Sequence, residues 1–170
     1  MSSRPGEVPR ISERAPLDPA LMRTLTGLEL MQRMFAGELP GVPIAKLMGM
    51  RGGEAGAGFT VFGALPGREH YNPIGTVHGG FAATILDSCM GCAVHTTLAA
   101  GISYTTIDLN ITYLRAMTEH TGEVTARGEV ITSGRRLATA RATLTDASGR
   151  LLATGTTSCL VFPLEESRRG

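Results

Sequence analysis

The sequence is poor in cysteine, in charge and in clustered basic residues, and each shortage removes a class of protein. Three cysteines among 170 residues, with no apolar leader near Met1, argue against a secreted disulfide framework and favour reduced thiols in a cytoplasmic protein. Charged residues make up only 18% of the chain, against roughly 25% in an average domain, so a folded chain is expected. The 16 basic residues are scattered, which excludes the electrostatic footprint of a nucleic-acid-binding protein.

Long uninterrupted apolar runs are also missing. The stretch Ser88–Ile107 carries no Asp, Glu, Lys or Arg, but His95, glycines and threonines interrupt it, so it is no transmembrane helix and no membrane partner is expected. A length of 170 residues fits one domain that can bury a core without disulfide or metal support.

The first forty residues predict an arm and one helix. Residues 1–16 hold three prolines and little apolar content, which predicts a mobile arm. Residues 17–41 are expected to form a helix and a turn, because Asp18 and Pro19 match an N-cap and a first helical position, and leucines recur at helical spacing up to Gly37. A first short strand is expected around Lys46–Arg51.

Alternation of apolar and polar residues predicts strands in the remainder, over residues 58–65, 103–115, 121–133, 137–145 and 150–162. The apolar faces expected to be buried are Phe59, Val61 and Leu65; Ile107, Leu109, Ile111 and Tyr113; Val124, Ala126 and Val130; Ala138, Ala140, Ala142 and Leu144; and Leu151, Ala153, Cys159 and Val161. Turns at Ser133–Gly134 and Ser148–Gly149 indicate hairpins and an antiparallel sheet.

Residues 78–98 break this pattern, because they are apolar almost all round and too numerous for one strand. They predict a buried helix. A single buried helix among strands that each bury one face is typical of an α+β fold in which the sheet curls around a central helix. Cys89 and Cys92 form a C-x-x-C within this helix, where core packing is the favoured interpretation over redox or zinc chemistry.

Asp87 is unusual because it is a charged residue within this apolar segment. From His70 to Ile107 it is the only formally charged side chain, and burying a carboxylate is costly unless it is paired or hydrogen-bonded. Either it lies at a wet edge of the helix or it has a function.

The start of the helix offers a complementary group. Glycines at His78-Gly79-Gly80, after a turn at Asn72–Gly75, place unpaired amides and the positive end of the helix dipole where an oxyanion could bind. Asp87 lies eight residues beyond Gly79, about 12 Å along a helix axis, which is too far for one reacting centre. Either the helix starts later than Gly79, or the two groups come from different subunits of a dimer.

The segments Asn72–Asp87 and Asp108–Ala116 resemble the hotdog-fold acyl-CoA thioesterases of the PaaI-like and THEM2-like group. The resemblance covers residues 42–163, most specifically the Asn…His-Gly-Gly…Asp spacing, and leaves a tail at 164–170 outside it. It implies a homodimer, often doubled to a homotetramer, with active sites at the dimer interface.

The resemblance also implies roles for individual residues. Asp87 would be general base or nucleophile, and Gly79 would donate its backbone N–H to the thioester carbonyl, assisted by Asn72 and His78. A hydroxyl that positions the attacking water falls on Thr106, with Thr105 as the alternative. The expected substrate- and coenzyme A-binding residues are Gly80, Arg115, Arg135 and Arg136, the arginines because their guanidinium groups suit phosphates.

This chemistry needs no metal and no organic cofactor, because a thiolate is already a good leaving group. The expected substrate is an aryl- or medium-chain acyl-CoA. Two rival functions stay open: a hotdog hydratase or dehydratase, and a non-catalytic acyl-CoA-binding or regulatory protein, since fold alone does not settle function.

Overall fold

The computed structural model describes residues 18–164. The arm expected over residues 1–16, and all of the expected tail except Leu164, lie outside this part of the chain. The elements in chain order are α1 (Pro19–Thr24), α2 (Gly27–Phe35), α3 (Pro43–Leu47), β1 (Met50–Gly56), β2 (Phe59–Ala64), the 3-10 turn η1 (Arg68–His70), α4 (Gly79–His95), β3 (Ile102–Tyr113), the 3-10 turn η2 (Glu119–Thr121), β4 (Val124–Ser133), β5 (Leu137–Asp146) and β6 (Leu151–Pro163).

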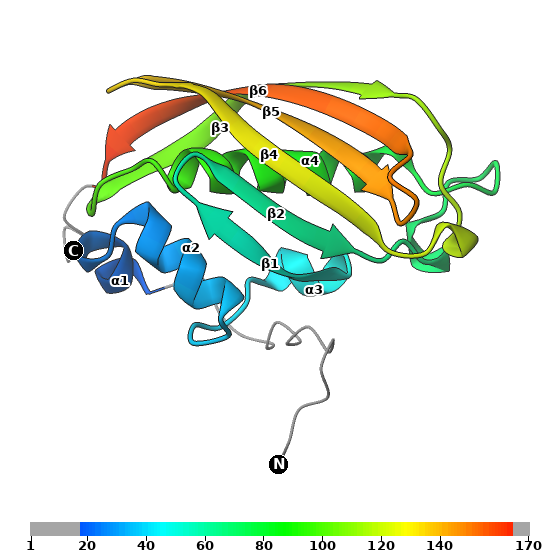
Figure 1. Cartoon of the computed structure of the whole chain (residues 1–170), viewed down its shortest axis with the longest axis horizontal. Helices are drawn as coiled ribbons and strands as arrows, with labels where there is room; N and C mark the ends of the chain where they lie inside the picture. The colour runs from blue at the N-terminus through cyan, green and yellow to red at the C-terminus, as the bar shows by residue number, and fades with distance from the viewer. Residues whose placement is uncertain (1–17, 165–170) are drawn as a thin grey trace, which may run out of the picture.

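The described strands form one six-stranded sheet in the order β1-β2-β4-β5-β6-β3. Every neighbouring pair is antiparallel, and the sheet curls around α4 (Figure 1). The hotdog arrangement expected from the sequence is therefore confirmed.

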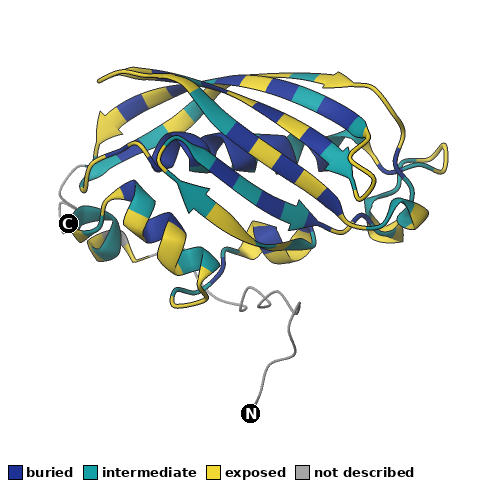
Figure 2. Ribbon diagram, in the orientation of Figure 1, coloured by how far each residue is buried: buried dark blue, intermediate teal, exposed yellow. Residues whose placement is uncertain are grey.

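Helix α4 is the centre of the core, as its apolar composition predicts. Figure 2 shows it buried along most of its length, although it ends at His95 rather than continuing to residue 98. A Cβ on Gly128 of β4 would lie 2.7 Å from the carbonyl oxygen of Cys89, so glycine is needed there for the sheet to approach the helix. No helix in residues 18–164 is long and apolar enough to cross a membrane.

The alternation predicted for β4 and β5 is confirmed, with Val130 only partly buried. In β6 it holds from Ala153 onward, but Leu152 is buried instead of Leu151, because the register with β5 shifts there. Strand β5 is the clearest case, since Ala138, Ala140, Ala142 and Leu144 are all buried. Small alanines on this face leave room for α4. The turns at Ser133–Gly134 and Ser148–Gly149 join antiparallel neighbours, as expected.

The face predicted for β2 is wrong, because the buried residues are Thr60, Phe62 and Ala64. Thr60 tolerates the interior since its Oγ1 donates a 2.8 Å hydrogen bond to the carbonyl oxygen of Cys89. Outside, the Phe59 ring lies 5.1 Å from the guanidinium of Arg127. The hydrogen bond lets Thr60 lie inside, and the guanidinium group covers Phe59 outside. The buried and exposed faces of β2 are therefore the opposite of those that hydrophobicity alone predicts.

The buried face predicted for β3 is also not covered within one chain. Ile107 is 56% exposed and Tyr113 is 54% exposed, and the register shifts between Thr106 and Asp108. Strand β3 lies at the edge of the sheet, with β6 as its only neighbour among the described strands. Its outer edge and its apolar side chains are therefore available to another surface.

The N-terminal part differs from the single helix expected. Asp18 caps α1 as predicted, its side chain accepting from Ala20 N. A second cap then interrupts the helix: Thr26 and Glu29 form a capping box that starts α2. The strand expected around Lys46–Arg51 is wrong in its first half, because Lys46 and Leu47 are the last residues of α3, and β1 starts only at Met50.

Both N-terminal helices are tied to the core by hydrogen bonds. The Gly27 amide donates to the Leu98 carbonyl at 3.0 Å, and the Gly101 amide donates to the Met22 carbonyl at 2.9 Å. The Gln32 side chain adds a 3.3 Å bond to the Ala55 carbonyl on β1. Figure 1 shows α1 and α2 beside β1, at the edge of the curled sheet.

Candidate active site

The first turn of α4 presents backbone donors at the surface. His78 is the N-cap, and its Nδ1 accepts a 2.8 Å hydrogen bond from the Gly80 amide. An accepting Nδ1 places the proton of the neutral imidazole on Nε2. Gly79 supplies the first helical amide, which has no acceptor within the helix. The Gly79 N–H and the His78 Nε2–H are thus two donors at the positive end of the helix dipole.

Asn72 shapes the loop that leads into this turn. Its Oδ1 accepts from the amides of Ile74 and Thr76 at 3.1 and 3.3 Å, and its Nδ2 donates to Thr76 Oγ1 at 3.0 Å. The described contacts of Asn72 therefore serve the loop itself, and its direct contact with a substrate stays a prediction.

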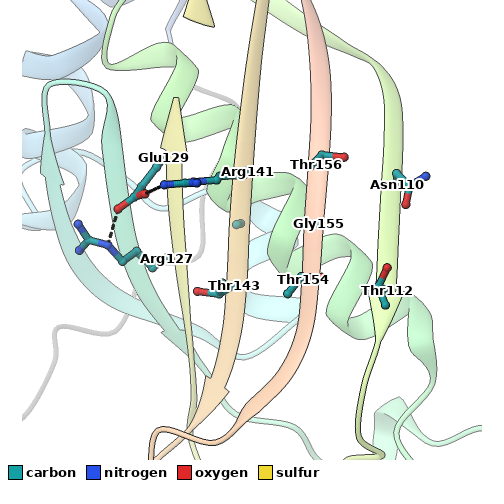
Figure 3. A pocket seen from close by; sticks show the side chains of 10 residues that line it. Asn110, Thr112, Arg127, Glu129, Arg141, Thr143, Thr154, Gly155 and Thr156 are labelled. Atoms are coloured by element: carbon teal, nitrogen blue, oxygen red, sulfur yellow. Dashed lines mark hydrogen bonds and ion pairs between the residues drawn. The ribbon is translucent and has the colours of Figure 1, made fainter. Parts of the chain in front are cut away.

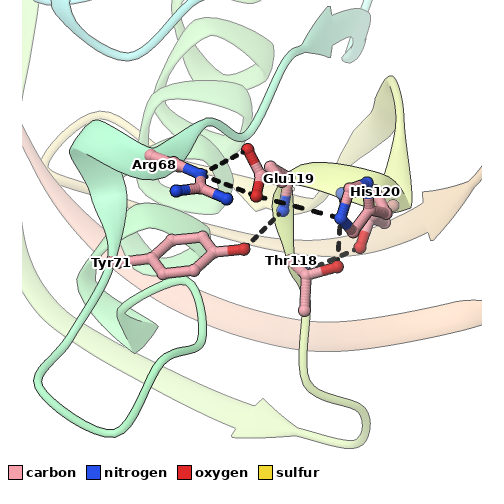
Figure 4. Close-up of polar contacts among 6 residues, drawn as sticks. Arg68, Tyr71, Thr118, Glu119 and His120 are labelled. Carbon is pink, nitrogen blue, oxygen red and sulfur yellow. Dashed lines mark hydrogen bonds and ion pairs between the residues drawn. The ribbon is translucent and has the colours of Figure 1, made fainter.

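A second set of bonds anchors the loop to the segment before β4 (Figure 4). The Tyr71 hydroxyl accepts from the Glu119 amide at 2.9 Å, and Arg68 Nε lies 2.7 Å from Glu119 Oε1. The hydrogen bond from Arg68 lowers the pKa of the Glu119 carboxyl. The amide of Val77 completes the attachment by donating to the Met117 carbonyl at 2.9 Å. The residue before His78 is thus held in place.

Asp87 lies half-buried on α4 and has one hydroxyl partner. Thr106 Oγ1 donates a 2.9 Å hydrogen bond to Asp87 Oδ1. Thr105, the alternative in the sequence, is exposed and borders the same space, but it makes no hydrogen bond to Asp87 among the described contacts. Because α4 begins at Gly79 itself, Asp87 stands about 12 Å along the axis from that amide within one chain.

The Asp87–Thr106 pair opens onto a cavity of about 550 Å³ between the N-terminal helices, α4 and β3. We call it the apolar cavity, since most of its wall is hydrophobic. The lining side chains from α1, α2, α3, β1 and β2 are Met22, Leu30, Met31, Met34, Phe35, Ile44, Ala45, Met50, Arg51 and Phe62, with Val42 just before α3; those from α4 and β3 are Asp87, Ser88, Cys92, His95, Ser103, Tyr104, Thr105 and Thr106. The methionines of residues 22–50 are the sequence signal of this cavity, although methionine is more often a flexible filler of a protein core.

A smaller hollow of about 310 Å³ lies beside the start of α4. Gly79, Tyr113 and Arg115 line it, and a Cβ on Gly79 would lie 3.1 Å from Tyr113 Cζ. Arg115 is exposed and donates to the Leu151 carbonyl. The structure therefore brings Arg115 close to the Gly79 end of the site.

Other expected coenzyme A-binding residues are not brought together with Arg115 in one chain. Arg135 and Arg136 lie on the β4–β5 turn, where Ser133 contacts Thr97 just past the end of α4. Helix α4 has 17 residues, so this turn and Gly79 are separated by about 25 Å along the axis. Gly80 lies beside Gly79, but its amide is already engaged by His78.

A third hollow, of about 480 Å³, lies on the outer face of the sheet (Figure 3). Glu129 pairs there with Arg127 at 2.9 Å and with Arg141 at 3.1 Å, among threonines of β5, β6 and β3. These bonds lower the pKa of the Glu129 carboxyl. The outer hollow is thus polar, with its main charges already paired, and α4 does not reach it.

The cysteines of α4 do not supply a nucleophile at neutral pH. Burial raises the pKa of the Cys89 and Cys92 thiols to about 12. Both therefore stay protonated, and only the thiolate is a good nucleophile. Within residues 18–164, no group of three His, Cys, Asp or Glu side chains is arranged to hold a metal ion.

Comparison with known proteins assigns the chain to a family. Residues 74–153, which contain Gly79, Asp87 and Thr106, match the thioesterase superfamily. Human acyl-coenzyme A thioesterase 13 is 34% identical over an alignment of 108 positions, which covers 56% of this chain and 74% of that protein.

Solved structures give the same result. A phenylacetic acid degradation-related protein from Ralstonia eutropha is 29% identical, with a TM-score of 0.69 over 76% of this chain and 98% of its own. A thioesterase from Haemophilus influenzae shares the fold at 20% identity, with a TM-score of 0.69 over 84% of this chain and 94% of its own. The chain therefore belongs to the thioesterase superfamily, as a hotdog-fold thioester hydrolase of the PaaI-like group.

Proposed function

We propose that this protein hydrolyses aryl- or medium-chain acyl-CoA thioesters, with Asp87 as the acid–base or nucleophilic group and the Gly79 amide as the oxyanion donor. The observation that carries the proposal is the Asp87–Thr106 hydrogen bond at the wall of the apolar cavity. The cavity suits an apolar acyl group, and the carboxylate stands where the thioester of such a group would lie.

The oxyanion donor must come from a second copy of the chain. One alternative, a helix that starts after Gly79, does not apply because α4 begins at that residue. Apolar side chains on the free edge of β3, among them Ile107, Leu109 and Tyr113, are exposed in the single chain. A long apolar edge strand is a surface that proteins normally cover. Pairing of β3 with its copy gives a homodimer in which each site uses groups from both chains.

The reaction follows from these groups. Thr106 holds Asp87 Oδ1, and Oδ2 receives no hydrogen bond from a described residue, so it is available to take a proton from water. The water oxygen attacks the thioester carbon, and the Gly79 N–H with the His78 Nε2–H stabilises the negative oxygen that forms. Collapse of this intermediate breaks the carbon–sulfur bond, and the thiolate of coenzyme A takes the proton back from Asp87.

Direct attack by Asp87 is the alternative first step. The carboxylate would then displace the thiolate and form a mixed anhydride, which water hydrolyses. Multiple turnovers in ¹⁸O-labelled water distinguish the two, since attack of water on the Asp87 carbonyl of the anhydride leaves label in the carboxylate, whereas base catalysis places it only in the product acid.

Arginines are the expected partners of the phosphates of coenzyme A. Arg115 lies beside Gly79, whereas Arg135 and Arg136 lie at the opposite end of α4. Two copies with antiparallel α4 helices would bring Arg115 of one chain toward the β4–β5 turn of the other. Doubling of the dimer to a tetramer stays a prediction.

The test is a thiol-release assay over a panel of acyl-CoA esters, comparing the native protein with Asp87→Asn. A catalytic carboxylate predicts a loss in kcat of at least about a hundredfold with ester binding retained. Binding of the esters without thiol release by either protein would support the non-catalytic alternative. Loss of absorbance from an enoyl-CoA, without thiol release, would support a hydratase.

A further inference from the structure

His95 is a buried polar side chain in the wall of the apolar cavity that the proposed reaction does not use. It is 9% exposed and lines the cavity two helical turns beyond Asp87. Within residues 18–164 no hydrogen bond to either ring nitrogen is found, and its ring contact is an edge-on approach to Tyr104 at 5.6 Å. The ring nitrogens keep some accessible surface, and His95 lines the cavity, so a group that enters the cavity can supply the hydrogen-bond partner that such a side chain normally has.

The surroundings hold the ring in place. A Cβ on Gly27 would lie 2.2 Å from His95 Cδ2, so α2 packs directly on that edge of the imidazole. On another side lies Tyr104, whose hydroxyl packs against Gly91 of α4. A ring fixed by α2 and β3 keeps its orientation toward the cavity, which is what a recognition group needs.

The charge state of His95 suits hydrogen bonding to a neutral group. Burial lowers the pKa of the imidazole, so at neutral pH it carries one N–H donor and one acceptor nitrogen. The hydroxyl of an alcohol or phenol can use either nitrogen, and a ketone oxygen can use the donor.

Polar and apolar residues occupy different parts of the cavity wall. Asp87 and Thr106 mark the end at which the thioester would react, and the methionines of α1 and α2 form an aliphatic wall. His95 is displaced from Asp87 by about 12 Å along α4. An acyl group anchored at Asp87 would therefore reach His95 only through an atom remote from its carbonyl carbon.

We propose that His95 is a specificity-determining residue at the distal end of the apolar cavity, where it hydrogen-bonds an oxygen carried by the acyl group far from the thioester. The enzyme then prefers acyl-CoA esters with a distal hydroxyl or keto group over unsubstituted esters of the same length. This inference rests on the proposed acyl-CoA hydrolysis and names the substrate class within it.

The test uses pairs of esters that differ only in the distal oxygen. The chain arm compares ω-hydroxyoctanoyl-CoA with octanoyl-CoA and ω-hydroxydecanoyl-CoA with decanoyl-CoA. The ring arm compares para-hydroxyphenylacetyl-CoA with phenylacetyl-CoA, so the two arms show whether chain or ring carries the oxygen. The readout is the ratio of kcat/KM within each pair, in which a general loss of activity cancels.

For the native enzyme we expect a ratio of at least about five in favour of the hydroxylated ester in one arm, as one net hydrogen bond gives. His95→Phe keeps a flat ring without nitrogens and should bring the ratio to about one or below. His95→Gln restores a donor and an acceptor and should recover part of the preference. The control is His120→Phe, an exposed histidine outside the cavity, which should keep the native ratio.

A native ratio of one in both arms would overturn the inference, whatever the variants do, and so would an unchanged preference in His95→Phe. If His95→Phe does not fold, the native ratio and His95→Gln still decide. If no ester is hydrolysed, the proposed function fails instead, and calorimetric binding of the same pairs to the native protein and His95→Phe tests His95 separately.

Discussion

Thr106 Oγ1 donates a 2.9 Å hydrogen bond to Asp87 Oδ1, joining the edge strand of the sheet to the central helix. The bond spans 19 positions of sequence and orients the only carboxylate that faces the apolar cavity among the residues that line it. It also decides between the two neighbouring threonines as the partner of Asp87. The hydrogen bond therefore fixes the orientation of the Asp87 carboxylate at the wall of the cavity.

Removal of this hydroxyl should impair turnover more than substrate binding. Thr106→Val keeps the shape of the side chain but leaves Asp87 without its donor, so we expect kcat to fall by roughly tenfold with KM little changed. Thr105→Val removes a neighbouring hydroxyl that borders the same cavity but makes no described hydrogen bond to Asp87, so it is the matched control and should have a much smaller effect. Steady-state thiol release measures both. Equal losses in the two variants would contradict the role given to the bond.

Removal of the Gly79 N–H can be separated from addition of a side chain. Gly79 is the first residue of α4, a position where proline fits a helix; proline removes the amide hydrogen, and its ring, like the alanine side chain, adds a Cβ. Gly79→Ala adds a Cβ against Tyr113 but keeps the N–H. We expect Gly79→Pro to be about a hundredfold slower in kcat than Gly79→Ala, the usual effect of losing one oxyanion donor. Similar rates for the two would exclude this amide as the donor.

Mixed dimers test whether Asp87 and Gly79 act from different chains. Asp87→Asn and Gly79→Pro should each be nearly inactive alone. If the site is shared, a dimer of one chain of each kind has one intact site, so a statistical mixture regains about a quarter of native activity. Activity is measured after the two proteins are unfolded and refolded together. No recovery, despite formation of mixed dimers by mass spectrometry, would place both groups in one chain.

The exposed edge of β3 should control assembly. Leu109→Asp puts a charge on the apolar edge, and we expect it to weaken the dimer and lower activity together. Ile131→Asp changes a similarly exposed apolar residue on β4, which β5 and β6 separate from β3, and should change neither. Sedimentation at several protein concentrations gives the oligomeric state. A native monomer with full activity would refute the shared site.

Acid stability depends in part on Asp146 in the β5–β6 turn. Hydrogen bonds from Ser148 and Arg150 lower the pKa of this carboxyl from 3.8 to about 2. Because the folded-state pKa is below the unfolded one, the carboxylate stabilises the fold above pH 3.8 and this contribution is lost as the pH falls toward 2. The difference in unfolding free energy between the native protein and Asp146→Asn should therefore shrink over that range. Urea denaturation at a series of pH values measures it.

The central helix and strands β4 to β6 could be predicted from the sequence because their patterns are unambiguous. Helix α4 is apolar on all sides, which only burial explains, and the alanines of β5 alternate strictly with polar residues. Asp87 could likewise be recognised as a candidate, since one charge in a long uncharged segment is costly without a role.

The predictions of buried faces failed where burial depends on more than the hydrophobicity of a side chain. In β2, Thr60 is inside because a helix carbonyl accepts its proton, and Phe59 is outside because Arg127 covers it. In β3, alternation shows that one side of the strand is apolar but not whether the same chain or a second copy covers it. The N-terminal helix was predicted without its break because leucine spacing continues across the capping box at Thr26.

The methionines of residues 22–50 are consistent with an acyl pocket, but the place and extent of the apolar cavity could not be predicted, because its wall is assembled from seven separate parts of the chain. No spacing rule connects Met34 to His95 or Met50 to Thr106. Only the folded chain shows that the methionines near the N-terminus and the acidic residue of α4 share one space.

Because α1 and α2 pack beside α4, the residues of the proposed chemistry and many residues that line the apolar cavity lie in different segments of the chain. The proposed chemistry depends on residues 78–106, whereas much of the lining that meets an acyl group belongs to residues 22–50. With the proposed function, substitutions among residues 22–50 would change acyl preference while the hydrolytic groups stay untouched, which makes these helices the place for an engineer to tailor selectivity.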